Sequence, residues 1–227
     1  MGELSNYFAL GFSALLPVVN PLGSALVFLG MVGLQSSAFY KVLARKIAIN
    51  MVVFFLVIEL VGSYLLQFFG ISVMIVQLAG GIVLAAMGWS VLNQGESGIK
   101  TDATEVAKKS IEERESDWAG KTFYPLMFPM TAGPGCLVVM LTLSAHATGK
   151  TLSAHVLARV GLMLSVLVLA VLVYLCYAYA PQITAKISPA TVHGILRVIA
   201  FILFCIGVQI AWNGLDSLIK PLLQSHA

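Results

Sequence analysis

The sequence predicts an all-α membrane protein with six transmembrane helices, arranged as 3+3 inverted repeats in which the first and fourth helices are broken. Three observations lead to this fold class. The chain of 227 residues is 59% hydrophobic and only 10% charged, whereas soluble domains carry about 25% charged residues. Two of its apolar runs are interrupted near their middle by proline and glycine. These interrupted runs recur in the two halves of the chain.

Six apolar runs are long enough to cross a bilayer, which takes about 20 helical residues. We expect the spans at residues 5–34, 47–69, 71–93, 122–146, 156–180 and 191–213. They divide the chain into a first three-helix repeat at 1–93, a polar cytoplasmic linker at 94–121 and a second, inverted repeat at 122–227. The short connection at 69–71 predicts that the second and third spans form an antiparallel hairpin. Residues 35–46 are expected to be a polar connection.

Lysine and arginine are distributed unevenly between the connections, and basic connections favour the cytoplasmic side of a membrane. The connections after the first, third and fifth spans hold nine basic residues, whereas the opposite side holds two or three. Both termini are therefore expected on the side away from the cytoplasm.

The two halves resemble each other most at their interruptions. Residues 17–23 read P-V-V-N-P-L-G, and residues 129–135 read P-M-T-A-G-P-G. In the third span of each half, Gly88 and Gly207 fall in matching places. Because a repeat has an odd number of spans, the second copy must insert upside down, as in many secondary transporters.

Each interruption is expected to start a new half-helix inside the membrane, at about Leu22 and about Pro134, and the Asn20 side chain is able to cap the first of them. Proline stops or kinks a helix, and a broken helix survives in lipid only when buried in protein or lining a wet cavity. The first N–H groups of a half-helix carry partial positive charge, so two such ends that converge at the midplane suit a carboxylate. A tightly packed kink without a ligand is the alternative. The predicted substrate-binding residues are Asn20, Pro21, Gly23, Ser24, Thr131, Ala132, Gly133, Pro134 and Gly135.

Glu59 lies well inside the second span, where an ionised carboxylate is costly. It is a candidate proton carrier for coupled transport, and a structural carboxyl that contacts a neighbouring helix is the alternative. Arg197 is expected to extend its charged end to the cytoplasmic surface. Six aromatic residues near span ends are expected to anchor the protein at the membrane interfaces: Trp89, Trp118, Tyr174, Tyr177, Tyr179 and Trp212.

Nothing in the sequence suggests covalent catalysis or a resident cofactor. H-E-x-x-H, G-x-S-x-G, C-x-x-C, phosphate-loop and dinucleotide motifs do not occur. Its three cysteines and four histidines lack metal-binding spacing, and the net charge of +3 is too small and dispersed for nucleic acid. We therefore expect a protein that is not an enzyme and has no metal or cofactor. Its expected partners are a small-molecule substrate and the lipid bilayer, and its oligomeric state is left open.

The interruption motifs resemble the MarC family of bacterial inner-membrane proteins. N-P-L-G at 20–23 and P-M-T-A-G-P-G at 129–135 carry the likeness, with A-G-G-I at 79–82 and G-V-Q followed by N-G at 207–214. The likeness covers essentially the whole chain. It implies a multi-pass inner-membrane protein, which together with the charge distribution puts both termini in the periplasm.

The resemblance also implies secondary transport of small neutral amino acids, here by alternating access at a midplane site. Coupling to H⁺ or Na⁺ stays open. A channel or exporter for another small solute is one alternative, and a non-transporting membrane scaffold is another.

Overall fold

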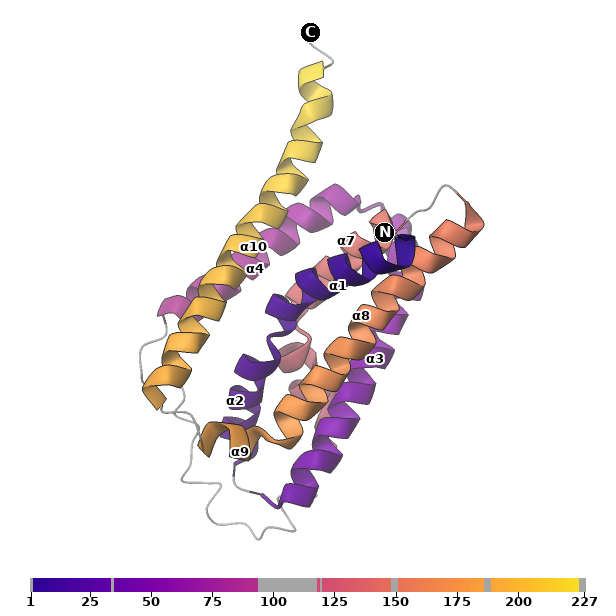
Figure 1. Ribbon diagram of the computed structural model, residues 1–227. Coiled ribbons are helices and arrows are strands. Elements are labelled where there is room, and N and C mark those ends of the chain that lie inside the picture. The colour runs from indigo at the N-terminus through magenta and orange to yellow at the C-terminus, as the bar shows by residue number, and fades with distance from the viewer. Residues whose placement is uncertain are drawn as a thin grey trace.

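The computed structural model describes residues 2–33, 35–93, 118, 120–147, 151–185 and 189–224. All regular structure in these ranges is helical (Figure 1). The helices are α1 (Glu3–Val19), α2 (Pro21–Val32), α3 (Ser37–Phe68), α4 (Val73–Asn93), η1 (Thr122–Thr131), α7 (Pro134–His146), α8 (Leu152–Ala178), α9 (Ala180–Ala185) and α10 (Pro189–Gln224). Most of the predicted linker at 94–121 lies outside the described residues.

Four helical stretches in the described part are long and apolar enough to cross a membrane, and the bent pair of η1 and α7 makes a fifth. The four are Glu3–Val32, Val73–Ser90, Leu152–Ala178 and Arg197–Lys220. The predicted second span falls within α3, which is not among them. An all-helical protein with four or five membrane-spanning candidates is thus established, while the arrangement of six spans as inverted repeats stays a prediction.

The start of α3 differs from the expected polar connection. Its helix begins at Ser37, and the Ser36 hydroxyl caps it by accepting a hydrogen bond from the Phe39 N–H at 3.2 Å. Lys41 and Arg45 therefore lie within α3, one helical turn apart. The sequence analysis placed them in a connection because they are charged. The cap at Ser36 and the apolar residues between them instead make these positions helical, so that α3 begins about three turns before the predicted start of the span at residue 47.

Helix α8 packs against α1, α2 and α3, while α7 packs against α1, α3 and α4. Phe28, Phe55 and Tyr177 are fully buried in this core. By contrast, Leu60, Phe68 and other large apolar side chains on the outer face of α3 are more than half exposed. Such a surface would drive aggregation in water, and it suits lipid.

The hairpin predicted for the second and third spans is wrong. Helix α4 turns away from α3 after Gly70, which has a φ of +66°, and packs along α10 instead. Figure 1 shows α4 and α10 as a pair beside the rest of the bundle. A short connection brings two helix ends together, but side-chain fit decides which helices pack along their length.

Glycines bring the backbones of α4 and α10 into contact. A Cβ atom added at Gly81 would lie 2.6 Å from the Gly207 carbonyl oxygen, and one added at Gly207 would lie 2.8 Å from the Gly81 carbonyl oxygen. Similarly, a Cβ atom at Gly88 would lie 2.6 Å from the Phe204 nitrogen. Small residues of this kind let membrane helices approach closely.

A fourth glycine completes a reciprocal pattern. A Cβ atom added at Gly214 would lie 2.6 Å from the Leu78 nitrogen. The same sequence shift relates Gly81 to Gly207, Gly88 to Gly214 and Leu78 to Phe204, so each contact occurs twice with the helices exchanged. The sequence analysis matched Gly88 with Gly207. The reciprocal contacts instead relate Gly88 to Gly214, which lies two helical turns further along α10.

Candidate functional site

The first predicted interruption is present at Asn20, between α1 and α2. Asn20 has φ 46° and ψ 66°, a left-handed conformation that asparagine tolerates better than most residues. Its N–H still donates to the Leu16 carbonyl at 2.9 Å, and its side-chain Oδ1 accepts from the Gly23 N–H at 3.0 Å. Pro21, which has no N–H to satisfy, is the first residue of α2. The expected cap on the half-helix is therefore confirmed, and α2 begins one residue before Leu22.

The second interruption separates η1 from α7, which are bent by 71° relative to each other. Gly133 precedes α7 with an extended backbone, and Pro134 is the first helical residue, as expected. The segment before it departs further from a regular helix than the sequence suggested, because Tyr124 and Phe128 have non-helical torsion angles. The fourth predicted span is thus a regular helix only in its second half.

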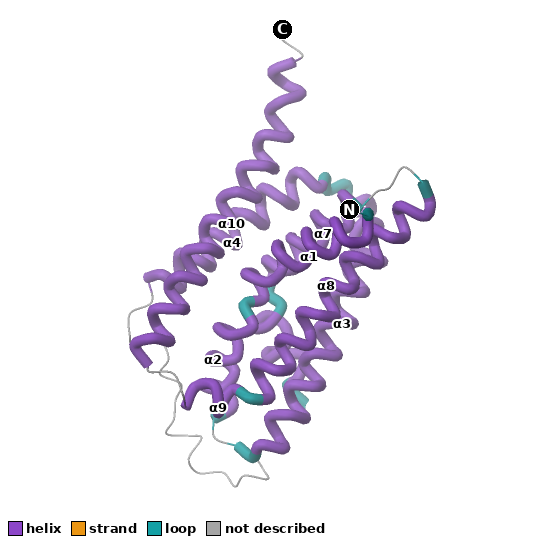
Figure 2. Tube along the Cα trace, in the orientation of Figure 1, coloured by secondary structure: helices purple, strands orange, loops and turns teal. Residues whose placement is uncertain are grey.

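Both interruptions lie in the same part of the bundle. Figure 2 shows the two short non-helical segments next to each other midway along the helices. Contacts agree with this view, since α1 packs on α7 and α2 packs on η1. A Cβ atom added at Gly135, two residues after the second break, would lie 3.3 Å from Cγ1 of Val18, two residues before the first. From this region α2 and α7 run toward opposite ends of the bundle (Figure 1).

Tyr177 of α8 connects the two interruptions. Its hydroxyl lies 2.8 Å from Oγ1 of Thr131, which donates its own proton to the Leu126 carbonyl at 2.6 Å. Tyr177 therefore donates to Thr131. The Tyr177 ring stacks on Phe28 of α2. One buried side chain thus reaches a residue of each broken helix.

The sequence analysis assigned Tyr177 to a membrane interface, and the structure contradicts that assignment. The side chain is fully buried, and its ring stacks on Phe28 of α2 with ring centres 4.5 Å apart. Proximity to the end of a span suggested an anchor, as for exposed Tyr179. Its position around the helix explains why Tyr177 is buried: Val166, Val173 and Tyr177 lie on one buried face of α8.

A cavity of about 440 Å³ borders the first interruption. Its walls come from the break and from the facing sides of α8 and α10, with Asn20, Cys176 and Ile202 among the lining residues. Within the described part of the chain, no lysine, arginine, histidine or carboxylate lines this cavity. Since Oδ1 of Asn20 is engaged by Gly23, the Nδ2 group is the part of this side chain that can donate to a bound molecule.

Most of the predicted site residues are packed inside the protein. Asn20 is partly buried and Pro134 is exposed, whereas the others are buried: Pro21, Gly23, Ser24, Thr131, Ala132, Gly133 and Gly135. Asn20 and Pro21 line the cavity, and the residues of the second interruption do not. The structure therefore brings the two groups together around Tyr177 and opens only the first of them to the cavity.

Glu59 lies in a different place, between α3 and α8. Its carboxylate is 3% exposed, and Oε1 lies 3.6 Å from Nη1 of Arg159. Arg159 also donates to Nε2 of His155 at 3.1 Å and to the Glu59 carbonyl at 3.4 Å. A separate cavity of about 250 Å³ borders Glu59 and Arg159 and shares no lining residue with the one at Asn20. Glu59 thus contacts a neighbouring helix through Arg159, as the structural alternative expects.

Comparisons with known proteins give one consistent result. Residues 5–219 match the family described as MarC family integral membrane protein. The chain is 29% identical over 220 residues to the UPF0056 inner membrane protein MarC of Escherichia coli O1:K1, covering 97% of this chain and 99% of that protein. It is 28% identical, over the same shares, to the protein of that name from Shigella flexneri. No solved structure gives a significant match.

Proposed function

We propose that this chain, which belongs to the MarC family of integral membrane proteins, is a secondary transporter of small neutral amino acids. That it is a multi-pass protein of the inner membrane follows from its relatives and its apolar helices. The observation that carries the transport proposal is the meeting of two broken helices beside a cavity, with Tyr177 between them. Broken helices at mid-membrane are the usual location of substrate sites in secondary transporters.

The chemistry of the cavity favours a small and uncharged solute. Its walls are apolar apart from Asn20 and the thiol of Cys176, so a charged side chain on the amino acid would lack a partner among the described lining residues. A zwitterionic amino acid brings one carboxylate, which the start of α2 and the Nδ2 group of Asn20 can receive. The predicted site residues of the second interruption would join the substrate in another state of the transport cycle.

The paired helices α4 and α10 support an inverted repeat. Their glycine contacts are reciprocal under one sequence shift, as expected when two copies of a helix meet across a two-fold axis. Such a repeat gives alternating access a structural basis, because each half can take the conformation of the other.

Coupling to protons is the second part of the proposal, with Glu59 as carrier. Neither carboxylate oxygen has a hydrogen-bond partner among the described residues, and the nearby cavity reaches both Glu59 and Arg159. Protonation would neutralise Glu59 and release Arg159. Replacing Glu59 with Gln should then abolish the acceleration of uptake by an imposed pH gradient. If a pH gradient accelerates uptake by Glu59→Gln as much as uptake by the wild-type protein, the Glu59 carboxylate has a structural role only.

Uptake by purified protein in liposomes tests the transport proposal. Labelled alanine, serine or glycine should enter saturably, and Gly133→Leu should abolish entry because an added Cβ meets the Pro129 carbonyl at 2.9 Å. Gly194→Leu is the matched control, since no atom of the described residues lies within 4 Å of a Cβ added there. No uptake of any of the three amino acids by correctly folded wild-type protein would contradict the proposal.

A further inference from the structure

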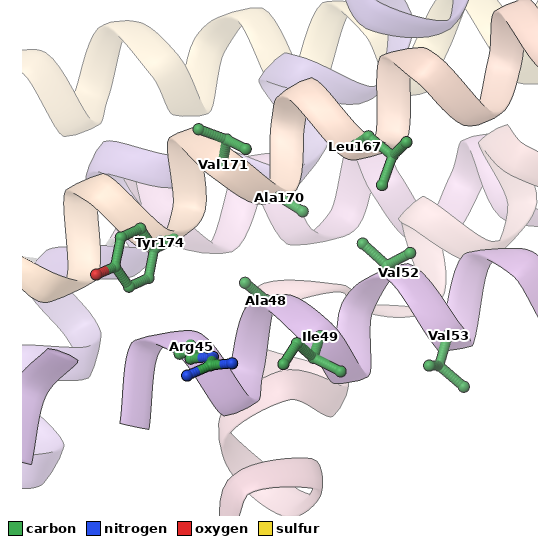
Figure 3. A pocket seen from close by; sticks show the side chains of 9 residues that line it. All are labelled: Arg45, Ala48, Ile49, Val52, Val53, Leu167, Ala170, Val171 and Tyr174. Carbon is green, nitrogen blue, oxygen red and sulfur yellow. The ribbon is translucent and has the colours of Figure 1, made fainter. Parts of the chain in front are cut away.

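A groove of about 650 Å³ runs between α3 and α8, apart from the two helix interruptions. Figure 3 shows its lining residues, five from α3 and four from α8. Ala48 of α3 and Ala170 of α8 face each other across it in the figure. Because alanine has only a methyl group, the larger neighbours Val52, Leu167 and Tyr174 leave a depression above this pair.

The groove has one polar end and is otherwise apolar. Arg45 and Tyr174 lie together at one end in Figure 3, and the side chains beyond them carry no polar atom. Lys41 is one helical turn before Arg45, and its Nζ lies 5.7 Å from the centre of the Tyr179 ring at the end of α8. Two cations and two tyrosines thus lie at or near this end, and no carboxylate is among the described residues that line the groove.

The position of the groove matches one leaflet of a bilayer. Its polar end lies where α3 begins and α8 ends, which is the end expected in the cytoplasm from the distribution of basic residues. Its apolar part extends from Ala48 to Val53, so that Arg45 and Val53 are about 12 Å apart along the helix axis at 1.5 Å per residue. This length is close to the hydrocarbon half-thickness of about 15 Å.

We propose that this groove binds an anionic phospholipid of the cytoplasmic leaflet. Its phosphate contacts Arg45 and Lys41, Tyr174 lies at the level of the headgroup, and one acyl chain fills the depression over Ala48 and Ala170. Charge complementarity selects this occupant, because two cations with no carboxylate among the described lining residues favour an anionic headgroup over a zwitterionic one. The site is independent of the proposed transport activity.

Native mass spectrometry tests the headgroup preference. Wild-type protein is released from nanodiscs with equal amounts of phosphatidylglycerol and phosphatidylcholine, and the retained lipids are counted. Wild-type should retain phosphatidylglycerol preferentially, and Arg45→Gln and Lys41→Gln should each lower that preference about fivefold. Arg197→Gln is the matched control, since it removes an exposed charge from α10 and should leave the preference unchanged.

Equal retention of the two lipids by wild-type protein would overturn the proposal, and so would an equal loss in Arg197→Gln. A second variant tests the acyl chain separately. Ala170→Leu fills the depression without altering charge, so it should reduce the number of retained lipids of either kind. A third outcome is that Arg45→Gln leaves the lipid preference unchanged and the wild-type protein is a dimer that meets through this face. The occupant is then a second copy of the chain, and the lipid assignment is wrong.

Discussion

Removing the Tyr177 hydroxyl should weaken the connection between the two broken helices by a measurable amount. Tyr177→Phe keeps the ring that stacks on Phe28 and deletes the hydrogen bond to Thr131. A buried hydrogen bond contributes about 1 kcal/mol to the free energy of unfolding, and membrane-protein measurements average about 0.6 kcal/mol. Thr131→Val removes two hydrogen bonds, the one from Tyr177 and the one to the Leu126 carbonyl, so we expect it to cost about 2 kcal/mol.

A double-mutant cycle isolates the shared bond. Tyr177→Phe combined with Thr131→Val should cost about 2 kcal/mol rather than about 3, because the bond that joins them can be lost only once. Reversible unfolding in mixed micelles, followed by circular dichroism, measures all four free energies. Tyr179→Phe is the control, as the same atom is removed from an exposed side chain and should change stability by under about 0.5 kcal/mol. Strictly additive losses would show that the two hydroxyls do not bond.

Three further substitutions test the remaining contacts. Arg159→Ala should cost about 1–3 kcal/mol in unfolding free energy, because buried Glu59 loses its cation, and Arg159→Ala combined with Glu59→Gln should recover part of the loss. Gly81→Val should destabilise the α4–α10 pair by about 1–3 kcal/mol through overpacking; Gly194→Val has open space around it and serves as its control. Asn20→Gly should be tolerated better than Asn20→Ala in a thermal-stability assay, since both lose the cap but only glycine suits the left-handed backbone. Equal stability of the two Asn20 variants would contradict this explanation.

The elements that local chemistry dictates were predictable from the sequence. Proline at 21 and 134 marks the start of each half-helix because it lacks an N–H, and this signal needs no knowledge of the rest of the fold. Runs of apolar residues likewise located most of the candidate spans. Asn20 was identified as a cap from its residue type alone, and the structure confirms the bond.

The features that depend on packing between distant segments were not predictable in this way. Tyr177 is buried because Phe28 and Thr131 lie opposite it, and neither is near it in the sequence. The partner of α4 is α10 rather than α3, since the glycines fit together only there. Arg159 was counted with the connections, although it reaches Glu59 across a helix interface. Each of these errors came from treating one helix at a time.

Protection of a native thiol tests the central claim most directly. Cys176 lines the cavity beside Asn20, so it can be labelled by a small thiol reagent in protein where Cys136 and Cys205 are replaced by alanine. A substrate that rests where the broken helices meet must slow this labelling. Saturating alanine should give full protection, and half of that protection should be reached at the concentration that half-saturates uptake. If alanine is transported while the labelling rate of Cys176 stays the same, the substrate passes elsewhere and the assignment of the site is wrong.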